Sequence, residues 1–231
     1  MKTVAIIQAR MESSRLPNKM LLNLHGQPIC EWVFRRVQQS EKVDQVVFAL
    51  PSSAKDDVLA RYLQSIGATF FRGSEMNLVE RYYMAAQETG ADQIVRVCAD
   101  NPLICASEID RLVDFYEHES CDYAYNHIPL ENLYPDGLGA EICSMQLLEE
   151  IWQKALIPDH CEHLFNFILD NRTDYTIKTF DPPDEIAYPE LKLDLNTPYD
   201  YQQLLEKPYQ INMSATDIVR TSLKHKVNPI K

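Results

Sequence analysis

The first half of the chain alternates between short apolar runs and longer stretches with helical spacing, and this alternation constrains the fold more than any other feature. The apolar runs, typical of buried strands, are residues 4–7, 45–50, 69–71 and 93–97. Apolar residues recur at helical spacing in residues 28–40, 56–66, 77–89 and 107–118. Four strand–helix repeats require right-handed crossovers. The sequence therefore predicts a three-layer α/β fold, with a mostly parallel sheet between two layers of helices.

Residues at the ends of the helical stretches support this assignment. Pro28 suits the first turn of a helix, because its fixed φ fits that position and its missing N–H is not needed there. Gly67 and Gly90 follow two of the stretches, where glycine commonly ends a helix. Ser107 is expected to cap the fourth helix.

The second half has a less regular pattern. Short strands are predicted at residues 123–125, 141–143, 175–180 and 191–195, and helices at residues 146–154 and 161–170. A chain of 231 residues suits one α/β domain, so residues 1–231 are expected to form a single domain. We expect the irregular region, roughly residues 121–190, to supply the pocket for a second substrate and a contact between subunits.

The composition disfavours several classes of protein. The net charge of −12 argues against a nucleic-acid partner, because an acidic surface repels the phosphate backbone. The six cysteines include no Cys-x-x-Cys pair, which disfavours a zinc site and favours free thiols in a reducing compartment. No apolar run approaches the ~20 residues of a membrane span, and the N-terminal run is too short for a signal peptide. We therefore expect a cytoplasmic protein without membrane contact.

A cationic loop follows the first predicted strand. Arg10, Arg15 and Lys19 lie close together in sequence, with the hydroxyl groups of Ser13 and Ser14 between them. Ligands of open α/β sheets bind beyond the carboxyl ends of the strands, where this loop lies. Arginine forks, a lysine charge and backbone N–H groups can together offset the charge of a triphosphate. The composition of the loop is equally compatible with a solvated surface loop.

Acidic residues follow two other predicted strands. Asp100 follows residues 93–97, and Asp194 lies near the end of residues 191–195, with Asn196 two positions later. Mg²⁺ binds through one or two carboxylates together with phosphate oxygens, so an aspartate at a strand end suits it. Taken alone, Asp100 also suits an Asx turn before Pro102. Two such carboxylates, which the fold can bring together, favour a Mg²⁺ site.

Several motifs make the sequence similar to a known family. Residues 7–10 and 14–19 resemble the N-terminal signature of the sugar-acid cytidylyltransferases, which include the CMP-KDO synthetases and the acylneuraminate cytidylyltransferases. Further matching stretches are residues 71–75, 80–83, 134–138, 162–163 and 193–200. The branch that the chain resembles most is the cytidylyltransferase-like proteins of spore-coat polysaccharide biosynthesis. The motifs follow the family's order and cover nearly the whole chain.

The resemblance implies a Rossmann-like nucleotidyltransferase fold, a mixed but mostly parallel sheet and a homodimer. It implies transfer of CMP from CTP to a sugar or sugar acid, with Mg²⁺ as cofactor and pyrophosphate as product. The implied nucleotide-binding residues are Gln8, Ala9, Arg10, Ser13, Ser14, Arg15, Lys19 and Arg72. The implied catalytic residues are Arg15, Lys19 and Asp100, and the implied metal ligands are Asp100, Asp194 and Asn196. The implied substrate-binding residues are Arg81, Asp136, Glu141 and His163. For Arg72 and Arg81 the base, a phosphate and an acceptor carboxylate are all candidate ligands. Arg81 equally suits an ion pair with a neighbouring glutamate, and His163 a structural role at a helix start.

Three residues depart from the family pattern. Glu12 and Asn18 stand where relatives often have glycine, and a glutamate in a triphosphate loop must point away from the phosphates. Asn196 stands where many relatives carry a second aspartate ligand. Its amide oxygen can coordinate a metal ion but brings no charge. Asp194, two residues earlier on the same strand face, is therefore the expected ligand.

Two other functions fit the same fold. One is a sugar-1-phosphate nucleotidyltransferase that uses another nucleoside triphosphate, although such enzymes usually open with a Gly-x-Gly-x-Arg loop that this chain lacks. The other is a non-catalytic nucleotide-binding module, which Asn196 in place of an acidic ligand favours. A glycosyltransferase is disfavoured, because the middle of the chain has no Asp-x-Asp motif.

Overall fold

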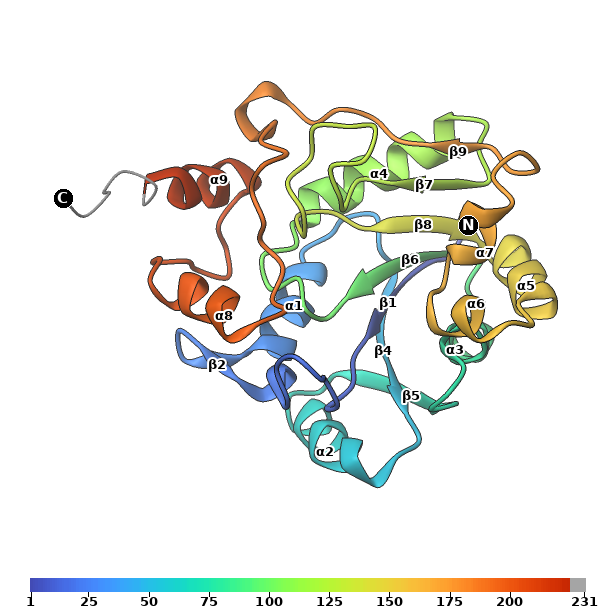
Figure 1. Cartoon of the computed structure of the whole chain (residues 1–231), viewed down its shortest axis with the longest axis horizontal. Coiled ribbons are helices and arrows are strands. Elements are labelled where there is room, and N and C mark those ends of the chain that lie inside the picture. The colour runs from blue at the N-terminus through green and yellow to red at the C-terminus, as the bar shows by residue number, and fades with distance from the viewer. Residues whose placement is uncertain (225–231) are drawn as a thin grey trace.

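A mixed sheet of seven strands runs through the computed structural model, which describes residues 1–224 (Figure 1). In spatial order the strands are β5 (Thr69–Gly73), β4 (Gln45–Pro51), β1 (Thr3–Gln8), β6 (Gln93–Cys98), β8 (Glu141–Ser144), β7 (Tyr123–Tyr125) and β9 (Ile177–Lys178). The first four in this order are parallel, β8 is antiparallel to both of its neighbours, and β7 pairs with β9 in parallel. The prediction of a mostly parallel mixed sheet in an α/β fold is confirmed.

Helices cover both faces of the sheet. The side chains of β1 therefore alternate between two apolar clusters, one on each face. Ala5 and Ile7 belong to the cluster that includes α1 (Ile29–Val37), α2 (Asp57–Ser65) and α4 (Ala106–His118). Val4 and Ile6 belong to the cluster that includes α3 (Leu78–Thr89) and α5 (Met145–Lys154). Both faces of the central parallel strands are buried, so apolar residues are favoured at every position.

The remaining helices extend the two apolar clusters on opposite faces of the sheet (Figure 1). The short helices α6 (Pro158–Glu162) and α7 (Asn166–Asp170) lie near α3 and α5, and α8 (Pro198–Leu205) and α9 (Ala215–Lys224) lie on the opposite side. The other short elements are η1 (Lys19–Leu21), β2 (Asn23–Leu24), β3 (Gln27–Pro28), η2 (Ala54–Asp56) and η3 (Asp184–Ile186). Within residues 1–224, no helix is long and apolar enough to cross a membrane.

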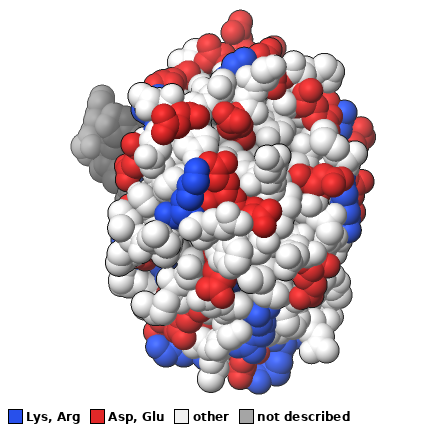
Figure 2. Space-filling view, turned by 90° about the vertical axis from the view of Figure 1, so that its right-hand side faces the viewer, with Lys and Arg blue, Asp and Glu red and all other residues white. Residues whose placement is uncertain are grey.

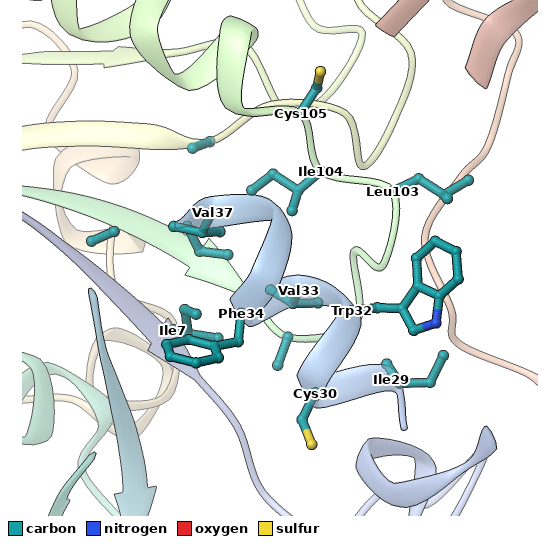
Figure 3. Packing of buried hydrophobic residues seen from close by; sticks show 14 of the residues in the cluster. Ile7, Ile29, Cys30, Trp32, Val33, Phe34, Val37, Leu103, Ile104 and Cys105 are labelled. Atoms are coloured by element: carbon teal, nitrogen blue, oxygen red, sulfur yellow. The ribbon is translucent and has the colours of Figure 1, made fainter. Parts of the chain in front are cut away.

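The first helix carries large side chains of one apolar cluster (Figure 3). Trp32 is 1% exposed, and its indole N–H donates a hydrogen bond to the carbonyl oxygen of Leu24 at 2.6 Å. The ring centroids of Phe34 and Phe48 are 5.8 Å apart, so α1 packs on β4. Because α1 follows the cationic loop in sequence, with only η1 and the β2–β3 hairpin between them, these contacts anchor one end of the loop to the sheet.

Several local predictions are wrong. Helix α4 begins at Ala106 after an N-cap at Cys105, and the Ser107 hydroxyl donates to Glu108 instead of capping the helix. The predicted helix at residues 161–170 is divided into α6 and α7, with residues 163–165 between them outside both helices. The predicted strand at residues 191–195 is an extended segment with one isolated bridge, between Asp136 and Lys192. Residues 225–231, part of the predicted single domain, lie outside the described residues.

We predict that the homodimer contact lies around residues 134–167, from the aromatic and apolar residues Tyr134, Leu138, Ile142, Leu164, Phe165 and Phe167. All of these except Phe167 are at most 3% exposed, and Phe167 is partly buried. Packing within one chain explains the apolar character of the five buried residues. The homodimer stays a prediction, which the family resemblance supports.

Surface charge follows the net charge of the chain. On the face that Figure 2 shows, acidic groups are widely distributed and basic groups form only small clusters. A nucleic-acid backbone would need a continuous basic surface, which this face lacks.

Arg36 of α1 links three segments that are distant in sequence. Its buried guanidinium donates to the carbonyl oxygens of Ile104 at 2.5 Å, Ile211 at 2.5 Å and Met213 at 3.1 Å. We expect Arg36→Met to lower the free energy of unfolding by ~3 kcal/mol or more, because it leaves buried carbonyls unpaired. Urea unfolding would measure this loss. The exposed Arg220→Met is the control and should change stability by less than ~0.5 kcal/mol; similar losses for both variants would contradict the assignment.

Candidate active site

A cavity of about 320 Å³, here called the first cavity, opens at the carboxyl ends of β1 and β6, beside the start of α3. Ligands of open α/β sheets bind at this position. The residues predicted from sequence that line it are Gln8, Ala9, Arg10, Ser13, Ser14, Arg15, Lys19, Arg81, Asp100 and His163. The fold thus brings most of the predicted residues together.

The cationic loop has a compact conformation held by backbone hydrogen bonds. The Asn18 N–H donates to the Met11 carbonyl at 3.1 Å, and the Met11 N–H donates to the Asp56 carboxylate at 2.7 Å. Asn18 has a φ of 60°, in the left-handed region that favours glycine and that asparagine tolerates better than most residues. Asn18 therefore meets the conformational requirement of a position where glycine is common in relatives.

Glu12, the other departure in this loop, forms an ion pair with Lys55. The expectation that Glu12 turns away from the ligand is only partly met, because Glu12 still borders the first cavity. Its charge is compensated by Lys55 instead. The loop therefore keeps the positive charge that Arg10, Arg15 and Lys19 bring to it.

The three cations of the loop have different surroundings. Lys19 is 9% exposed, and its Nζ donates to Asp100 Oδ2 at 2.7 Å and to the Leu195 carbonyl at 3.0 Å. The Arg15 guanidinium donates to Asn196 Oδ1 at 2.6 Å. The side chain of Arg10 is 58% exposed, 4.0 Å from Glu162. Lys19 is thus a buried, paired residue, whereas Arg10 and Arg15 are the accessible cations.

Residues 191–196, here called the acidic segment, lie next to the end of β6, although they do not form a strand. The Leu195 N–H donates to the Asp100 carbonyl at 2.7 Å, and the Leu193 N–H donates to the Asp136 carbonyl at 2.9 Å. Gly137, with a φ of +89°, allows this approach, because a Cβ atom there would lie 3.0 Å from the Asp194 nitrogen. Asp100, Asp136 and Asp194 are thereby brought into one acidic group.

Two carboxylates of this group, Asp136 and Asp194, have raised pKa values. Burial, then the charge of Asp194, raises the pKa of Asp136 to about 6, against the opposing effect of Lys192. Burial also raises the pKa of Asp194, with a further contribution from Asp100. A cation placed among these carboxylates would relieve both the desolvation and the repulsion.

The acidic group has the chemistry of a site for a hard divalent cation. Asp194 Oδ2 accepts a hydrogen bond from the Asn196 amide, whereas its Oδ1 is buried without a hydrogen bond in residues 1–224, 3.6 Å from Lys192 Nζ. Within the same residues, no three His, Cys, Asp or Glu side chains are arranged to hold a metal ion by themselves. Substrate phosphates and water would therefore have to complete its coordination, as is usual for Mg²⁺.

Two predicted residues lie elsewhere than expected. Arg72 does not line the first cavity, and its guanidinium donates to Asp57 at 2.6 Å and to the Ser53 carbonyl at 2.6 Å. Asp136 lines neither this cavity nor the second one described below. Arg81 is 5% exposed in the wall of the first cavity and forms no ion pair with a neighbouring glutamate within residues 1–224.

A second cavity, of about 160 Å³, adjoins the first and shares Arg96 and His163 with it. Its lining residues are Arg96, Tyr123, Tyr125, His127, Ile128, Leu130, Glu141, His163, Leu164, Phe165, Asn166 and Leu169. Two of the predicted substrate-binding residues, Glu141 and His163, therefore line one cavity, which adjoins the first cavity.

A buried ion pair separates the two cavities. Arg96 on β6 is directly opposite Glu141 on β8 and bonds to its carboxylate, and its Nε donates to Gln8 Oε1 at 3.1 Å. Tyr123 donates to the same carboxylate at 2.6 Å. Burial alone would raise the pKa of Glu141, but Arg96, His127 and Tyr123 outweigh it and lower that pKa. Glu141 is thus a charged group in a buried network.

Sequence reasoning missed Arg96, Tyr123 and His127 as cavity residues. Arg96 lies in the middle of a predicted buried strand, where a charged side chain is rare unless it is paired. That rarity was the available signal. Tyr123 and His127 carry no comparable signal, because their place at the cavity depends on how β7 pairs with β8.

We expect Asp136→Asn to stabilise the ligand-free protein at pH 8 by on the order of 1 kcal/mol. Asp136 is charged in the folded state at that pH, and the difference between its pKa of about 6 and the ordinary aspartate value corresponds to a cost of about 3 kcal/mol. The partial exposure of Asp136 to solvent reduces this cost. The gain should roughly halve at pH 5, because folded Asp136 takes up a proton as the pH falls through about 6. Urea unfolding at both pH values measures it. The exposed Asp184→Asn should show no such gain, and a pH-independent effect of Asp136→Asn would contradict the prediction.

Comparison with known proteins establishes the family. The sequence profile of the family described as Cytidylyltransferase matches residues 4–211. A spore coat polysaccharide biosynthesis protein of Bacillus subtilis is 28% identical over 204 residues, 86% of this chain and 83% of that protein. A 3-deoxy-manno-octulosonate cytidylyltransferase of Chlorobium phaeobacteroides is 37% identical over 112 residues, 48% of this chain and 44% of that protein. The structure of a cytidylyltransferase from Leptospira borgpetersenii superposes with a TM-score of 0.89 at 27% identity, over 100% of this chain and 99% of that one. Because the profile spans most of its length, the chain belongs to the cytidylyltransferase family.

Proposed function

We propose that this protein transfers CMP from CTP to a hydroxyl group of a sugar acid for polysaccharide synthesis, releasing pyrophosphate. The observation that carries the proposal is the convergence of Arg10, Arg15 and Lys19 on one cavity beside Asp100, in a chain whose net charge is −12. Such a local cationic cluster suits a triphosphate. The family supports CTP as the donor, and the relatives named for spore coat polysaccharide and for 3-deoxy-manno-octulosonate support a sugar acid as the acceptor.

The cations of the loop have separate roles in this proposal. Transfer at phosphorus depends mainly on positioning and on stabilising charge. Arg10 orients the α- or β-phosphate, and Arg15 and Lys19 stabilise the charge that develops on pyrophosphate. In the ligand-free protein Lys19 already has a carboxylate partner, Asp100, at 2.7 Å. The triphosphate must therefore compete with Asp100 for Lys19 unless another cation takes over Asp100.

That other cation is Mg²⁺ in our proposal, held by Asp100 and Asp194 together with phosphate oxygens. When bound, it would neutralise phosphate charge and lower the pKa of the acceptor hydroxyl. Asn196 bridges Asp194 and Arg15 by hydrogen bonds, so we assign it the positioning of these two side chains.

The second cavity is the proposed acceptor site. Glu141 and His163 both line it, and His163 also borders the first cavity. An acceptor held there would have its attacking hydroxyl at the junction of the two cavities, near the α-phosphate. Holding both reactants in this way supplies much of the rate enhancement of a two-substrate reaction.

Two further proposals follow from the family resemblance. We propose a homodimer, which light scattering at micromolar concentration would test; a monomer would refute it.

We also propose a cytoplasmic location, because CTP is made and consumed in the cytoplasm.

Ligand-dependent thermal stability tests the nucleotide. We expect CTP with Mg²⁺ to raise the melting temperature more than UTP, GTP, ATP or dTTP does, since a ligand at ~100 times its Kd adds ~2.7 kcal/mol of stability. A larger shift with another triphosphate would favour the sugar-1-phosphate nucleotidyltransferase. Binding of CTP without turnover of any sugar acid would favour the non-catalytic module.

Arg15→Ala should reduce turnover with little loss of stability. Arg15 lies in a polar loop, and one lost phosphate contact that strengthens in the transition state should cost ~2–4 kcal/mol of barrier, or ~30- to 1000-fold in rate. The exposed Arg61→Ala on α2 should leave turnover unchanged. Lys19→Ala is a less clean test, because Lys19 is buried against Asp100 and its loss should also lower stability. Wild-type turnover in a folded Arg15→Ala variant would remove this residue from the mechanism.

The metal ligands can be separated by three substitutions. Asp100→Asn and Asp194→Asn should each lower Mg²⁺-dependent turnover by orders of magnitude while the protein still folds. Asn196→Asp should change the Mg²⁺ concentration needed for half-maximal rate little, because Asp194 already supplies the charge. The opposite pattern, an inactive wild type and an Asn196→Asp variant that gains transfer, would show that the natural site is incomplete.

A further inference from the structure

Asp56 stands at the start of a helix, where an aspartate usually caps the first turn, yet it makes no such cap. It ends η2 and is the N-cap residue of α2. An aspartate at this position ordinarily accepts a hydrogen bond from a backbone N–H of the first turn. The Asp56 side chain makes no cap hydrogen bond and is buried, with the residue 2% exposed. Its carboxylate is therefore directed to a partner outside α2.

That partner is the base of the cationic loop. Asp56 Oδ1 accepts a hydrogen bond from the Met11 N–H at 2.7 Å. Met11 is 6% exposed, so both groups are shielded from water. The Met11 carbonyl in turn accepts from the Asn18 N–H at 3.1 Å and closes the loop. Met11 thus connects the two ends of the loop to one buried carboxylate.

Arg10 lies between two anchored residues. The Ala9 N–H donates to the Ala49 carbonyl at 3.4 Å, just beyond the paired part of β1 and β4. On the other side, Met11 is held by Asp56. The Arg10 side chain itself is 58% exposed, and its ion pair with a glutamate of α6 spans 4.0 Å. The direction in which Arg10 leaves the backbone is therefore set by its two neighbours, since its own contacts restrain it weakly.

Asp56 also brings a charge close to the first cavity. Burial raises the pKa of Asp56, and the hydrogen bond from Met11 lowers it. The positive charges of Arg72 and Arg81 lower it further. Arg81 lines the first cavity, and its Nε is buried without a hydrogen bond in residues 1–224. Two properties of Asp56 therefore reach the site, its hydrogen bond to Met11 and its charge, which acts on Arg81.

We propose that Asp56 is a positioning residue for the nucleotide, and that it acts through its hydrogen bond to Met11. The bond fixes the base of the loop, so that Arg10 meets a phosphate group without rearrangement of the backbone. A loop that is already ordered binds its ligand at a lower cost. Asp56 lines neither of the two cavities, so it acts on the ligand through the loop. This inference rests on the proposed function, because it names a further residue on which the same nucleotide site depends.

Three substitutions at Asp56 separate the hydrogen bond from the charge. Asp56→Asn keeps an acceptor oxygen in place and removes the charge, whereas Asp56→Glu keeps the charge and moves it by one methylene group. Asp56→Ala removes both. Titration calorimetry with CTP and Mg²⁺ should give a Kd within about threefold of the wild type for Asp56→Asn. For Asp56→Glu and Asp56→Ala it should be about tenfold or more weaker, the range of one hydrogen bond to a charged group.

The opposite order of affinities identifies the charge as the cause. Asp56→Asn binding as weakly as Asp56→Ala, or Asp56→Glu binding like the wild type, would overturn the proposal. Asp44→Ala is the matched control, because Asp44 accepts the Thr3 N–H at 2.7 Å at the other end of β1. It should keep the wild-type affinity, and an equal loss there would show a general loosening of the fold instead of positioning. If Asp56→Ala does not fold, the Asn and Glu variants still decide the question.

Amide hydrogen exchange of the ligand-free protein tests the loop without any nucleotide. We expect peptides that contain residues 9–18 to exchange several-fold faster in Asp56→Glu and Asp56→Ala than in the wild type and Asp56→Asn, because the loop opens locally. Unchanged exchange in the Glu and Ala variants would also overturn the proposal. A wild type whose loop is protected but which does not bind CTP would count against the proposed function, while the exchange comparison would still decide whether Asp56 holds the loop.

Discussion

The ion pair between Lys19 and Asp100 connects the parts of the molecule on which the site depends. Lys19 ends the cationic loop, Asp100 follows β6, and the same ammonium group also binds the carbonyl of Leu195. Three segments distant in sequence are thus fixed at one point, which lies at the carboxyl end of the central parallel strands. A buried lysine is tolerated there because it is paired with Asp100 and donates a second hydrogen bond to Leu195. Together with the hydrogen bond from Arg15 to Asn196, this junction connects the cationic loop directly to the acidic segment.

A second buried ion pair, between Arg96 and Glu141, connects β6 and β8 beside the second cavity. Arg96 and Glu141 are cross-strand neighbours on β6 and β8, where the parallel part of the sheet meets its antiparallel part. The pair forms the wall between the two cavities, so the regular first half of the chain supplies one face of that wall and the irregular second half the other.

The regular half of the fold and the gathering of several residues at the first cavity could be predicted from the sequence. Parallel strands buried on both faces leave a strong apolar signal, and loops at their carboxyl ends are the expected ligand positions, which led to Arg10, Arg15, Lys19 and Asp100. The position of Lys19 could not be predicted in full, since its burial depends on Asp100 and Leu195, both distant in sequence.

Other features depend on tertiary contacts that no local pattern records. Residues 191–195 alternate as a strand would, yet within residues 1–224 they form only one bridge, between Lys192 and Asp136. Arg72 belongs to a family motif but is bonded to Asp57 and two backbone carbonyls. Tyr134 and Phe165 looked like interface residues because composition does not distinguish an interior from an interface, and only packing does.

The acidic group carries a local electrostatic cost. Gly137 lets the backbone at Asp194 approach closely, and this approach brings the charges of Asp136 and Asp194 together. Lys19 and Lys192 offset part of the repulsion, but Asp136 still has a pKa of about 6. A sequence selected for stability alone would replace one of these carboxylates by a neutral side chain. A positively charged ligand, such as the Mg²⁺ that we propose, would relieve this repulsion and leave the cations of the neighbouring loop available for the negative charges of a triphosphate.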